Sequence, residues 1–312
     1  MGVYECCYNS KPLRSNGWII IYYKSVVKQN TWESHRHRVE IWVLNLGDKE
    51  LKKITVSDIR KVINELYYSK NYAKDTLRKL KDTVSLILDY AFEIGAVEVN
   101  VAKSVKIPKQ ASKRKRPPLT PNQFNTVLNN RFLMPFGPYA LFLVLTGCRP
   151  SEPLALTTDD LLFEERLIRI NKTVVYLRGN EPQIEYKLKT DINEKYVPMV
   201  DLLYEVLLTY KGHKGYIFGD ENGELLTRRQ VVHRWRQYQN DCQMFGTRYN
   251  CRHTFSLLCK RADIDPLLHK LYMGHSSVAT SYDIYTQLDL SDIQEGVPKL
   301  NDYLNQTYLK SK

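Results

Sequence analysis

With 312 residues, the chain is longer than one average domain and predicts two, each large enough to bury its own core. Its formal net charge of +12 favours a polyanionic partner, nucleic acid before a membrane surface, because lysine and arginine release counterions when they neutralise phosphates. The longest apolar run, Tyr139 to Leu145, is far shorter than the roughly 20 residues that span a bilayer. This argues against a membrane protein and favours a soluble, cytoplasmic one.

The six cysteines form no CxxC pair and have no spacing typical of a zinc site or a disulfide framework. We therefore expect reduced thiols and no bound metal. The sequence also lacks the glycine-rich phosphate loops GxGxxG and GxxxxGK[ST], so we expect no cofactor.

The segment from Thr31 to Gly95 has the apolar spacing of a small helical bundle. Thr55 and Asp58 resemble a capping box at the start of its middle helix, and Gly95 can supply a left-handed stop after the last one. An earlier helix is expected from about Thr31 to Leu46. The residues expected to face the core are Val39, Trp42, Val43, Ile59, Val62, Ile63, Leu66, Tyr67, Leu77, Leu80, Val84, Ile87, Leu88 and Ala91.

A segment bounded by prolines, Pro108 to Pro118, carries five basic residues among the eight from Lys109 to Arg116. The prolines disfavour a continuous helix, so we interpret residues 108–118 as a basic linker between two domains. Such a linker can follow a phosphate backbone, although a solvated tether or, in a eukaryote, an import signal would have a similar composition. The residues predicted to bind DNA here are Lys113, Arg114, Lys115 and Arg116.

The chain after this linker is predicted to be mainly helical with one small antiparallel sheet. Thr120 and Gln123 combine an N-cap with its capping-box partner at the start of the first helix. Short segments rich in β-branched residues place the sheet near residues 166–199. Helices are expected again from about Val200 and after Thr227, where Gln230 completes another capping pattern. The whole chain is therefore expected to be mainly α with a small antiparallel β-sheet.

Four segments of this second part carry residues suited to chemistry, in the order "TGCRPSEPLAL", "LKTDINEKYVPM", "YNCRHTF" and "LYMGHSSVATSYDIYTQL". Together, residues 120–290 resemble the catalytic domain of the tyrosine recombinase (phage integrase) family, in its conjugative-transposon-like branch. Residues 25–107 resemble the family's helical, SAM-like core-binding domain. The resemblance implies a short N-terminal segment at 1–24, a DNA-binding domain at 25–107, the linker at 108–118, and a catalytic domain with a C-terminal tail at 119–312.

The first segment resembles TGxRxSExxxL, which implies Arg149 as a catalytic arginine and Glu152 as its acidic supporter. The second resembles KTxxSxRxVPL, which implies Lys189 as the catalytic lysine on a β-hairpin. Lys187 is the alternative, but only Lys189 is followed by threonine and lies at the right distance from Val197. A lysine at either position would also be typical of a solvated edge strand.

The third segment resembles HxxRHTF, which implies Arg252 as the second catalytic arginine. Tyr249 stands where the family has histidine. Tyrosine can donate a hydrogen bond to a phosphoryl oxygen, but it is a poor base near neutral pH. His253 would point about 100° away from Arg252 on a helix, so we expect it to be structural.

The fourth segment resembles LxGHSSxxTTxxxYTH, which implies His275 as a hydrogen-bond donor and Tyr285 as the nucleophile. Tyr282 is the alternative nucleophile, but it lies too close to His275 and is not followed by threonine. Only Tyr285 has both features.

The resemblance implies that DNA strands are cleaved and rejoined through a 3′-phosphotyrosyl intermediate. Attack by a phenolic oxygen places negative charge on phosphate oxygens, which two permanently charged arginines can stabilise. Lys189 can give up a proton and is the expected general acid for the leaving 5′-hydroxyl. Neither a metal nor ATP is required, because side chains supply the charge and the phosphotyrosyl bond keeps the free energy of the phosphodiester.

The expected function is a site-specific recombinase, or integrase, that integrates or excises a mobile element such as a viral genome. The alternatives are chromosome-dimer resolution, topoisomerase-like relaxation and DNA binding without catalysis. Expected partners are double-stranded DNA, further copies of the chain in a homotetramer on two DNA sites, and an accessory DNA-bending or directionality factor. Leu300, Tyr303 and Leu304 lie at helical spacing, in a helix that docks on a neighbouring protomer or packs within its own chain.

Overall fold

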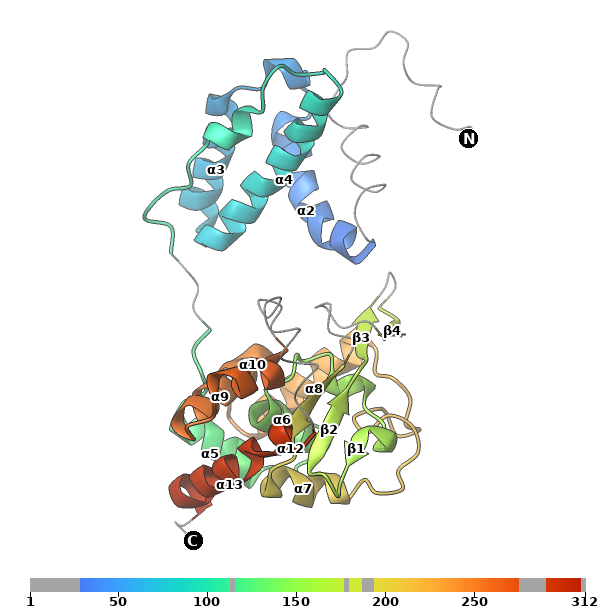
Figure 1. Cartoon of the computed structure of the whole chain (residues 1–312). Coiled ribbons are helices and arrows are strands. Elements are labelled where there is room, and N and C mark those ends of the chain that lie inside the picture. Colours follow the sequence, from blue (N-terminus) through green and yellow to red (C-terminus); the bar gives the residue numbers. More distant parts are fainter. Residues whose placement is uncertain (1–28, 113–115, 177–179, 187–193, 275–289, 310–312) are drawn as a thin grey trace. The chain divides into compact units, whose positions relative to one another are not determined.

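The computed structural model describes residues 29–112, 116–176, 180–186, 194–274 and 290–309 (Figure 1). The chain divides into two units between Lys115 and Arg116. Each unit has its own apolar core, as the chain length predicts. In the part of the chain described here, no helix is both long enough and apolar enough to cross a membrane.

The first unit is a small bundle of helices. Its elements are α2 (Gln29–Leu46), η1 (Leu51–Lys53), α3 (Val56–Lys70), α4 (Lys74–Glu93) and η2 (Val101–Ser104). The predicted capping box is confirmed, because Asp58 N donates to the Thr55 hydroxyl while Thr55 N donates to the Asp58 carboxylate. Gly95 follows α4 at φ +72°, which is the left-handed conformation expected there.

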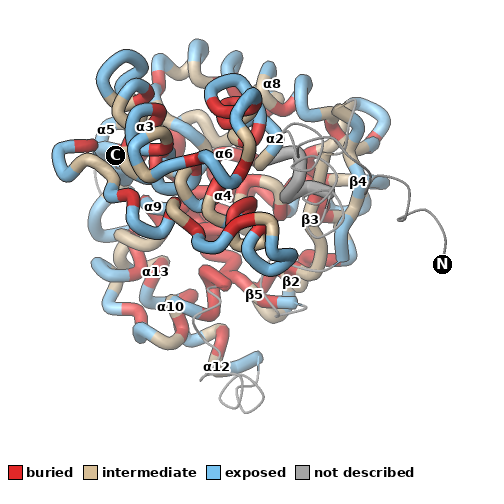
Figure 2. Tube along the Cα trace, turned by 90° about the horizontal axis from the view of Figure 1, so that it is seen from above, coloured by how far each residue is buried: buried red, intermediate tan, exposed pale blue. Residues whose placement is uncertain are grey.

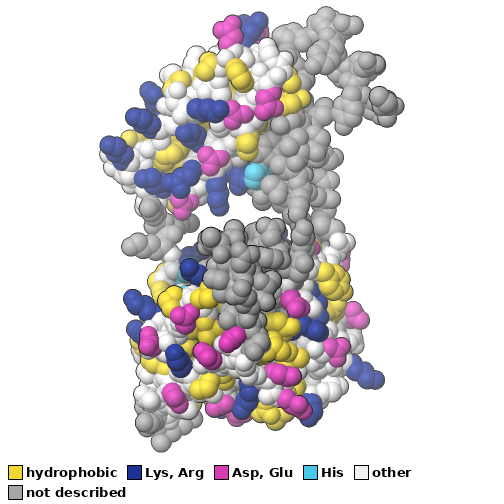
Figure 3. Space-filling model, in the orientation of Figure 1, with side chains coloured by type: hydrophobic (Ala, Val, Ile, Leu, Met, Phe, Trp, Pro, Cys, Tyr) yellow, Lys and Arg dark blue, Asp and Glu magenta, His cyan; other side chains and the backbone are white. Residues whose placement is uncertain are grey.

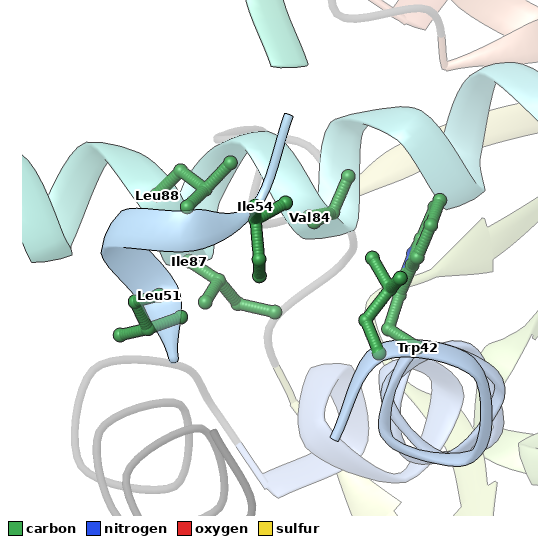
Figure 4. A pocket seen from close by; sticks show the side chains of 7 residues that line it. Trp42, Leu51, Ile54, Val84, Ile87 and Leu88 are labelled. Carbon is green, nitrogen blue, oxygen red and sulfur yellow. The ribbon is translucent and has the colours of Figure 1, made fainter. Parts of the chain in front are cut away.

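The core of the first unit contains the residues that the helical spacing predicts. All of them are buried except Val43 and Tyr67, which are half-buried. The Trp42 indole N–H donates to Leu80 O at 2.9 Å, so this large side chain is fixed by packing and by a hydrogen bond. A pocket beside it is lined by Trp42, Leu46, Leu51, Ile54, Val84, Ile87 and Leu88 (Figure 4).

The second unit is also mainly helical. Its α-helices are α5 (Pro121–Asn129), α6 (Gly137–Thr146), α7 (Asp201–Leu208), α8 (Arg228–Asp241), α9 (Arg248–Arg261), α10 (Pro266–Met273), α12 (Leu290–Gln294) and α13 (Gly296–Leu304). Shorter turns of helix are η3 (Pro153–Ala155), η4 (Thr158–Asp160) and η6 (Asn305–Leu309). The capping boxes predicted from Thr120 and Thr227 are both present, at the starts of α5 and α8.

Two small antiparallel sheets lie in the second unit, where the sequence predicted one. The strands are β1 (Leu161–Leu162), β2 (Leu167–Ile170), β3 (Thr173–Tyr176), β4 (Pro182–Glu185) and β5 (Lys195–Pro198). One sheet has the order β1-β2-β5, with Ile170 opposite Lys195, and the other pairs β3 with β4. The predicted antiparallel strands are confirmed, and they pair as two small sheets because β-branched residues indicate where strands form but not which strands pair.

Helix α6 is the centre of the second unit. All ten of its residues are buried, as is typical of a helix that is apolar on every side (Figure 2 colours the chain by burial). It packs against α5, α7 and α9. The residues that follow α6 are therefore placed beside α9, the helix that carries Arg252.

The C-terminal helix α13 packs within its own unit. Leu300 and Leu304 are buried in the core of the second unit, and Asn301 Oδ1 accepts a hydrogen bond from Asp201 N at 2.9 Å. Of the two alternatives for this helix, the structure shows packing within its own chain, which covers the apolar surface of Leu300 and Leu304.

Candidate active site

Arg149 lies in the turn that follows α6. Gly147 ends that helix at φ +64°, and a Cβ there would lie 2.4 Å from the Phe255 ring and 2.8 Å from Met273 Sδ. Glycine is therefore required for its conformation and for its small size. The turn leaves 20% of the Arg149 side chain exposed.

Glu152 holds Arg149 at two points. Its Oε2 accepts a hydrogen bond from Arg149 N at 2.8 Å, and its Oε1 accepts one from Arg149 Nη1 at 3.0 Å. Only 2% of Glu152 is exposed, so the contact is shielded from water and stronger than a surface ion pair. The structure therefore places these two predicted residues together.

Arg252 lies on α9 and is buried. Its Nη1 donates to Gly147 O and its Nη2 donates to Met273 O at 2.6 Å. Burial lowers the pKa of Arg252, the charge of Glu152 opposes that effect, and the charge of Arg149 adds to it. The guanidinium stays protonated, because the ordinary pKa of arginine is above about 12.

The carboxyl end of α10 joins these side chains. The carbonyl oxygens of Tyr272, Met273 and Gly274, which are consecutive in sequence, accept hydrogen bonds from Lys195, Arg252 and Arg149 respectively. Carbonyls at the end of a helix lack partners within the helix and carry its negative dipole end, so they suit cationic donors. The end of α10 thus gathers three cations from three other elements.

Lys195 is the residue of this group that the sequence reasoning missed. It begins β5 and is fully buried, and its Nζ lies 2.9 Å from Glu152 Oε2 and 3.4 Å from Tyr272 O. Burial raises the pKa of Glu152, but Lys195 and then Arg149 lower it below its usual range, so the carboxylate is ionised. The signal was present in the sequence, because Lys195 occupies the arginine position of the pattern KTxxSxRxVPL.

Tyr249 lies one turn before Arg252 on α9 and is 43% exposed. The guanidinium of Arg116, from the predicted basic linker, lies 5.0 Å from the centre of the Tyr249 ring. Two hydrogen bonds hold residues 117–119 against α9. Asn250 Nδ2 donates to Pro117 O at 2.7 Å, and Leu119 N donates to Thr254 Oγ1 at 2.8 Å. The end of the segment predicted as a linker is therefore packed on the helix that carries Arg252.

Several predicted residues lie outside the described part of the chain. They are Lys189, His275 and Tyr285, the alternatives Lys187 and Tyr282, and the linker residues Lys113, Arg114 and Lys115. His253, expected to be structural, is exposed on α9. Of the predicted catalytic set, the structure brings together Arg149, Glu152 and Arg252, with Tyr249 nearby in sequence on the same helix.

The arrangement is suited to an anion. Two permanently charged guanidinium groups are held by protein oxygens at the end of one helix, and arginine pairs well with phosphate oxygens. Among the described residues, no group of three histidine, cysteine, aspartate or glutamate side chains is placed to hold a metal ion. What the described geometry provides is fixed positive charge.

Comparison with known sequences agrees with the motifs. The profile of the phage integrase family matches residues 118–291, and that of the phage integrase N-terminal SAM-like domain matches residues 16–67. A probable integrase of prophage ps2 from Lactococcus lactis is 27% identical over 65% of this chain and 58% of its own length. The transposase of transposon Tn916 from Enterococcus faecalis is 27% identical over 54% of this chain and 46% of its own length. The chain thus spans about half the length of these relatives.

Comparison with solved structures agrees with the fold. The Tn1549 transposon integrase, solved in complex with a circular intermediate DNA, superposes with a TM-score of 0.71 at 20% identity, over 84% of this chain and 91% of that one. A lambda integrase tetramer bound to a Holliday junction superposes with a TM-score of 0.65 at 17% identity, over 83% and 75% of the two chains. The fold is that of the tyrosine recombinases, a helical SAM-like domain and a catalytic domain. The chain belongs to the phage integrase family.

Proposed function

We propose that this chain is a site-specific DNA recombinase that cleaves and rejoins DNA strands to integrate or excise a mobile element. The observation that carries the proposal is the pair of guanidinium groups, Arg149 and Arg252, held at the end of α10. Fixed cations of this kind stabilise a phosphate on which negative charge develops. The family, and the named relatives among prophage and transposon proteins, support a mobile element as the source.

In the proposed reaction, the phenolic oxygen of Tyr285 gives its proton to water and attacks the phosphorus of one phosphodiester. A phosphorus–oxygen bond to Tyr285 forms, the bond to the 5′ oxygen breaks, and Lys189 gives that oxygen a proton. Arg149 and Arg252 neutralise the non-bridging oxygens, and His275 donates a hydrogen bond to one of them. A 5′-hydroxyl from a partner duplex then reverses the attack and joins the strands.

Tyr249 takes the place of the family's histidine in this proposal. It lies one helical turn from Arg252, and its exposure leaves the hydroxyl accessible to DNA. Its role would be to donate a hydrogen bond to a phosphoryl oxygen, since tyrosine is a poor base near neutral pH.

The proposed partner is double-stranded DNA, acted on in the cytoplasm, with further copies of this chain completing a tetramer on two DNA sites. The basic residues of the first unit support a phosphate-rich partner, and Lys and Arg side chains gather on the face of that unit drawn in Figure 3. The related lambda integrase was solved as a tetramer on a Holliday junction, which supports the assembly. We also propose an accessory DNA-bending or directionality factor as a partner.

A nicked suicide substrate tests this proposal. Duplexes made from the DNA that flanks the coding region are incubated with the protein. After cleavage, the short fragment between the cleavage site and the nick, which carries the new 5′-hydroxyl, diffuses away and cannot be rejoined. We expect a covalent protein–DNA adduct that is absent in Tyr285→Phe. The matched control, Tyr282→Phe, should keep the adduct.

Two results would contradict the proposal. Tight DNA binding with no adduct on any flanking site would indicate a DNA-binding protein without catalysis. Loss of the adduct in Tyr282→Phe, but not in Tyr285→Phe, would show that the nucleophile is assigned to the wrong tyrosine.

A further inference from the structure

Glu152 poses an electrostatic problem for the proposed site. Its ionised carboxylate orients Arg149, but it also brings a negative charge next to the place where a phosphate is to bind. An unscreened carboxylate in a buried site would cancel much of the attraction between Arg149 and the phosphate, since charges interact more strongly away from water. The site therefore needs a further cation that does not itself bind the phosphate.

Lys195 has the position that such a cation requires. It is fully buried, and its Nζ lies 2.9 Å from the same Glu152 Oε2 that accepts the backbone N–H of Arg149. With Lys195 included, the cluster holds the cations Arg149, Arg252 and Lys195 against one carboxylate, so its formal net charge is +2 instead of the +1 that the two arginines and Glu152 give alone. A fully buried ammonium cannot reach DNA, so its effect must pass through Glu152.

Lys195 also supports the turn at the end of α10. A Cβ on Gly274 would lie 3.0 Å from Lys195 Cδ and 3.5 Å from its Nζ, so the lysine stem packs directly beneath that turn. Gly274 O is the acceptor for Arg149 Nη2 at 3.1 Å. One lysine therefore contacts both groups that hold Arg149 in place.

We propose that Lys195 is a positioning residue of the active site, which keeps Glu152 ionised and neutralised so that Arg149 is aligned and its charge is available to the scissile phosphate. This inference rests on the proposed recombinase function and adds a residue that does not touch the substrate. It also explains why a lysine is buried in the core of a DNA-cleaving domain.

The test compares Lys195→Met with Lys195→Arg in the suicide-substrate assay. Methionine keeps the apolar volume without the charge, and we expect cleavage about 100-fold slower because small misplacement of a catalytic group is costly. Arginine keeps the charge and should restore most of the rate. DNA affinity should change little in either variant, because Lys195 is not exposed to DNA.

A matched control is available in the same unit. Lys172 Nζ lies 2.6 Å from the buried carboxylate of Asp160, which also accepts a hydrogen bond from Thr157 N and lies 3.6 Å from the Arg169 guanidinium, and does not contact Arg149. Lys172→Met removes one cation from a second buried carboxylate, so it should lower thermal stability without a matching loss of cleavage. If Lys172→Met slows cleavage as much as Lys195→Met, the loss reflects general destabilisation and the inference is wrong.

The pH dependence gives a second readout that a purely structural role would not produce. Without Lys195, burial raises the pKa of Glu152, so the carboxylate takes up a proton as the pH falls. The ratio of the Lys195→Met rate to the wild-type rate should therefore decrease from about pH 8.5 to about pH 5.5. The other titratable groups around Glu152 are Arg149, Arg252 and the Cys148 thiol. Burial raises the pKa of Cys148 to about 11, so this thiol stays protonated and neutral in this range.

The double variant Glu152→Gln with Lys195→Met keeps the test valid if the single variant folds poorly. It removes both buried charges, and a neutral pair in place of an ion pair is tolerated better than one unpaired charge. Its rate should stay below that of the wild type, but its ratio to the wild-type rate should not vary with pH. A flat ratio in Lys195→Met, or a wild-type rate in that variant, would overturn the inference.

A measurement without DNA separates this inference from the recombinase proposal. In protein labelled with ¹³C at glutamate carboxyl groups, the Glu152 signal is assigned by its loss in Glu152→Gln. We expect it to titrate at a higher pH in Lys195→Met than in the wild type. Identical titration would refute the role of Lys195 whatever the enzyme does, whereas a wild type that forms no adduct refutes the recombinase proposal alone.

Discussion

Each arginine of the site is held by protein oxygens before any substrate arrives. Arg149 is held by Glu152 and Gly274 O, and Arg252 by Gly147 O and Met273 O. Catalytic groups that are already oriented need not reorganise during the reaction. The motifs predicted that Arg149, Glu152 and Arg252 would meet, and they do. Lys195 was missed although it occupies the arginine position of one motif, because a lysine on a strand is typically exposed and its burial depends on a carboxylate from another segment.

The turn at Gly274 yields a prediction at this scale. Alanine there would have to adopt φ +58° and would press on Lys195, which lies 3.0 Å from the added Cβ. We expect Gly274→Ala to lower the free energy of unfolding by about 1–2 kcal/mol and to slow cleavage. Chemical denaturation and the adduct assay measure the two effects.

Gly212 supplies the control for this prediction. It has φ +83°, but a Cβ there would contact nothing within 4 Å. Gly212→Ala should therefore cost a similar conformational free energy and leave cleavage unchanged. Equal effects of the two substitutions on cleavage would contradict the role given to the turn at Gly274.

At the scale of elements, the starts of helices could be predicted because their signals are local. The capping boxes at Thr55, Thr120 and Thr227 each depend on two residues three positions apart. Strand partners and the packing of residues 116–119 on α9 could not be predicted, because they depend on contacts between distant segments. Local sequence patterns therefore predict where helices and strands form better than they predict which elements pack together.

The cap of α3 yields a prediction with a defined pH dependence. Hydrogen bonds from the Lys49 ammonium, which has the larger effect, and from Thr55 N lower the pKa of Asp58 from 3.8 to about 2. Because the folded pKa is lowered, the stabilisation is complete above the unfolded value and is lost as the pH falls toward about 2. We expect Asp58→Ala to destabilise α3 by about 1 kcal/mol at neutral pH, and by less as the pH is lowered from about 4 to about 2.

Native-state hydrogen exchange of the α3 amides measures this effect. The control is Asp75→Ala in α4, whose carboxylate is exposed and lies 3.5 Å from Arg78. Exposed pairs contribute little, so this variant should exchange like the wild type. The capping argument would be contradicted if the two variants gave the same protection.

At the scale of the whole molecule, the two-unit organisation follows from length and from two apolar cores that do not share residues. The mainly helical fold with small antiparallel strands is confirmed, and so is membership of the phage integrase family. DNA contacts of Lys113, Arg114 and Lys115, and the roles of Lys189, His275 and Tyr285, remain predictions. These residues lie outside the described part of the chain.

The central claim is that Arg149 and Arg252 act together on the charge of a single scissile phosphate. The most direct measurement compares an ordinary suicide substrate with one that carries a neutral methylphosphonate at the cleavage position. On the phosphate, we expect Arg149→Ala to slow adduct formation by about 10²–10³. On the methylphosphonate, which has no charge to neutralise, the same substitution should slow it far less, and Arg252→Ala should behave alike. An equal loss on both substrates would contradict the account.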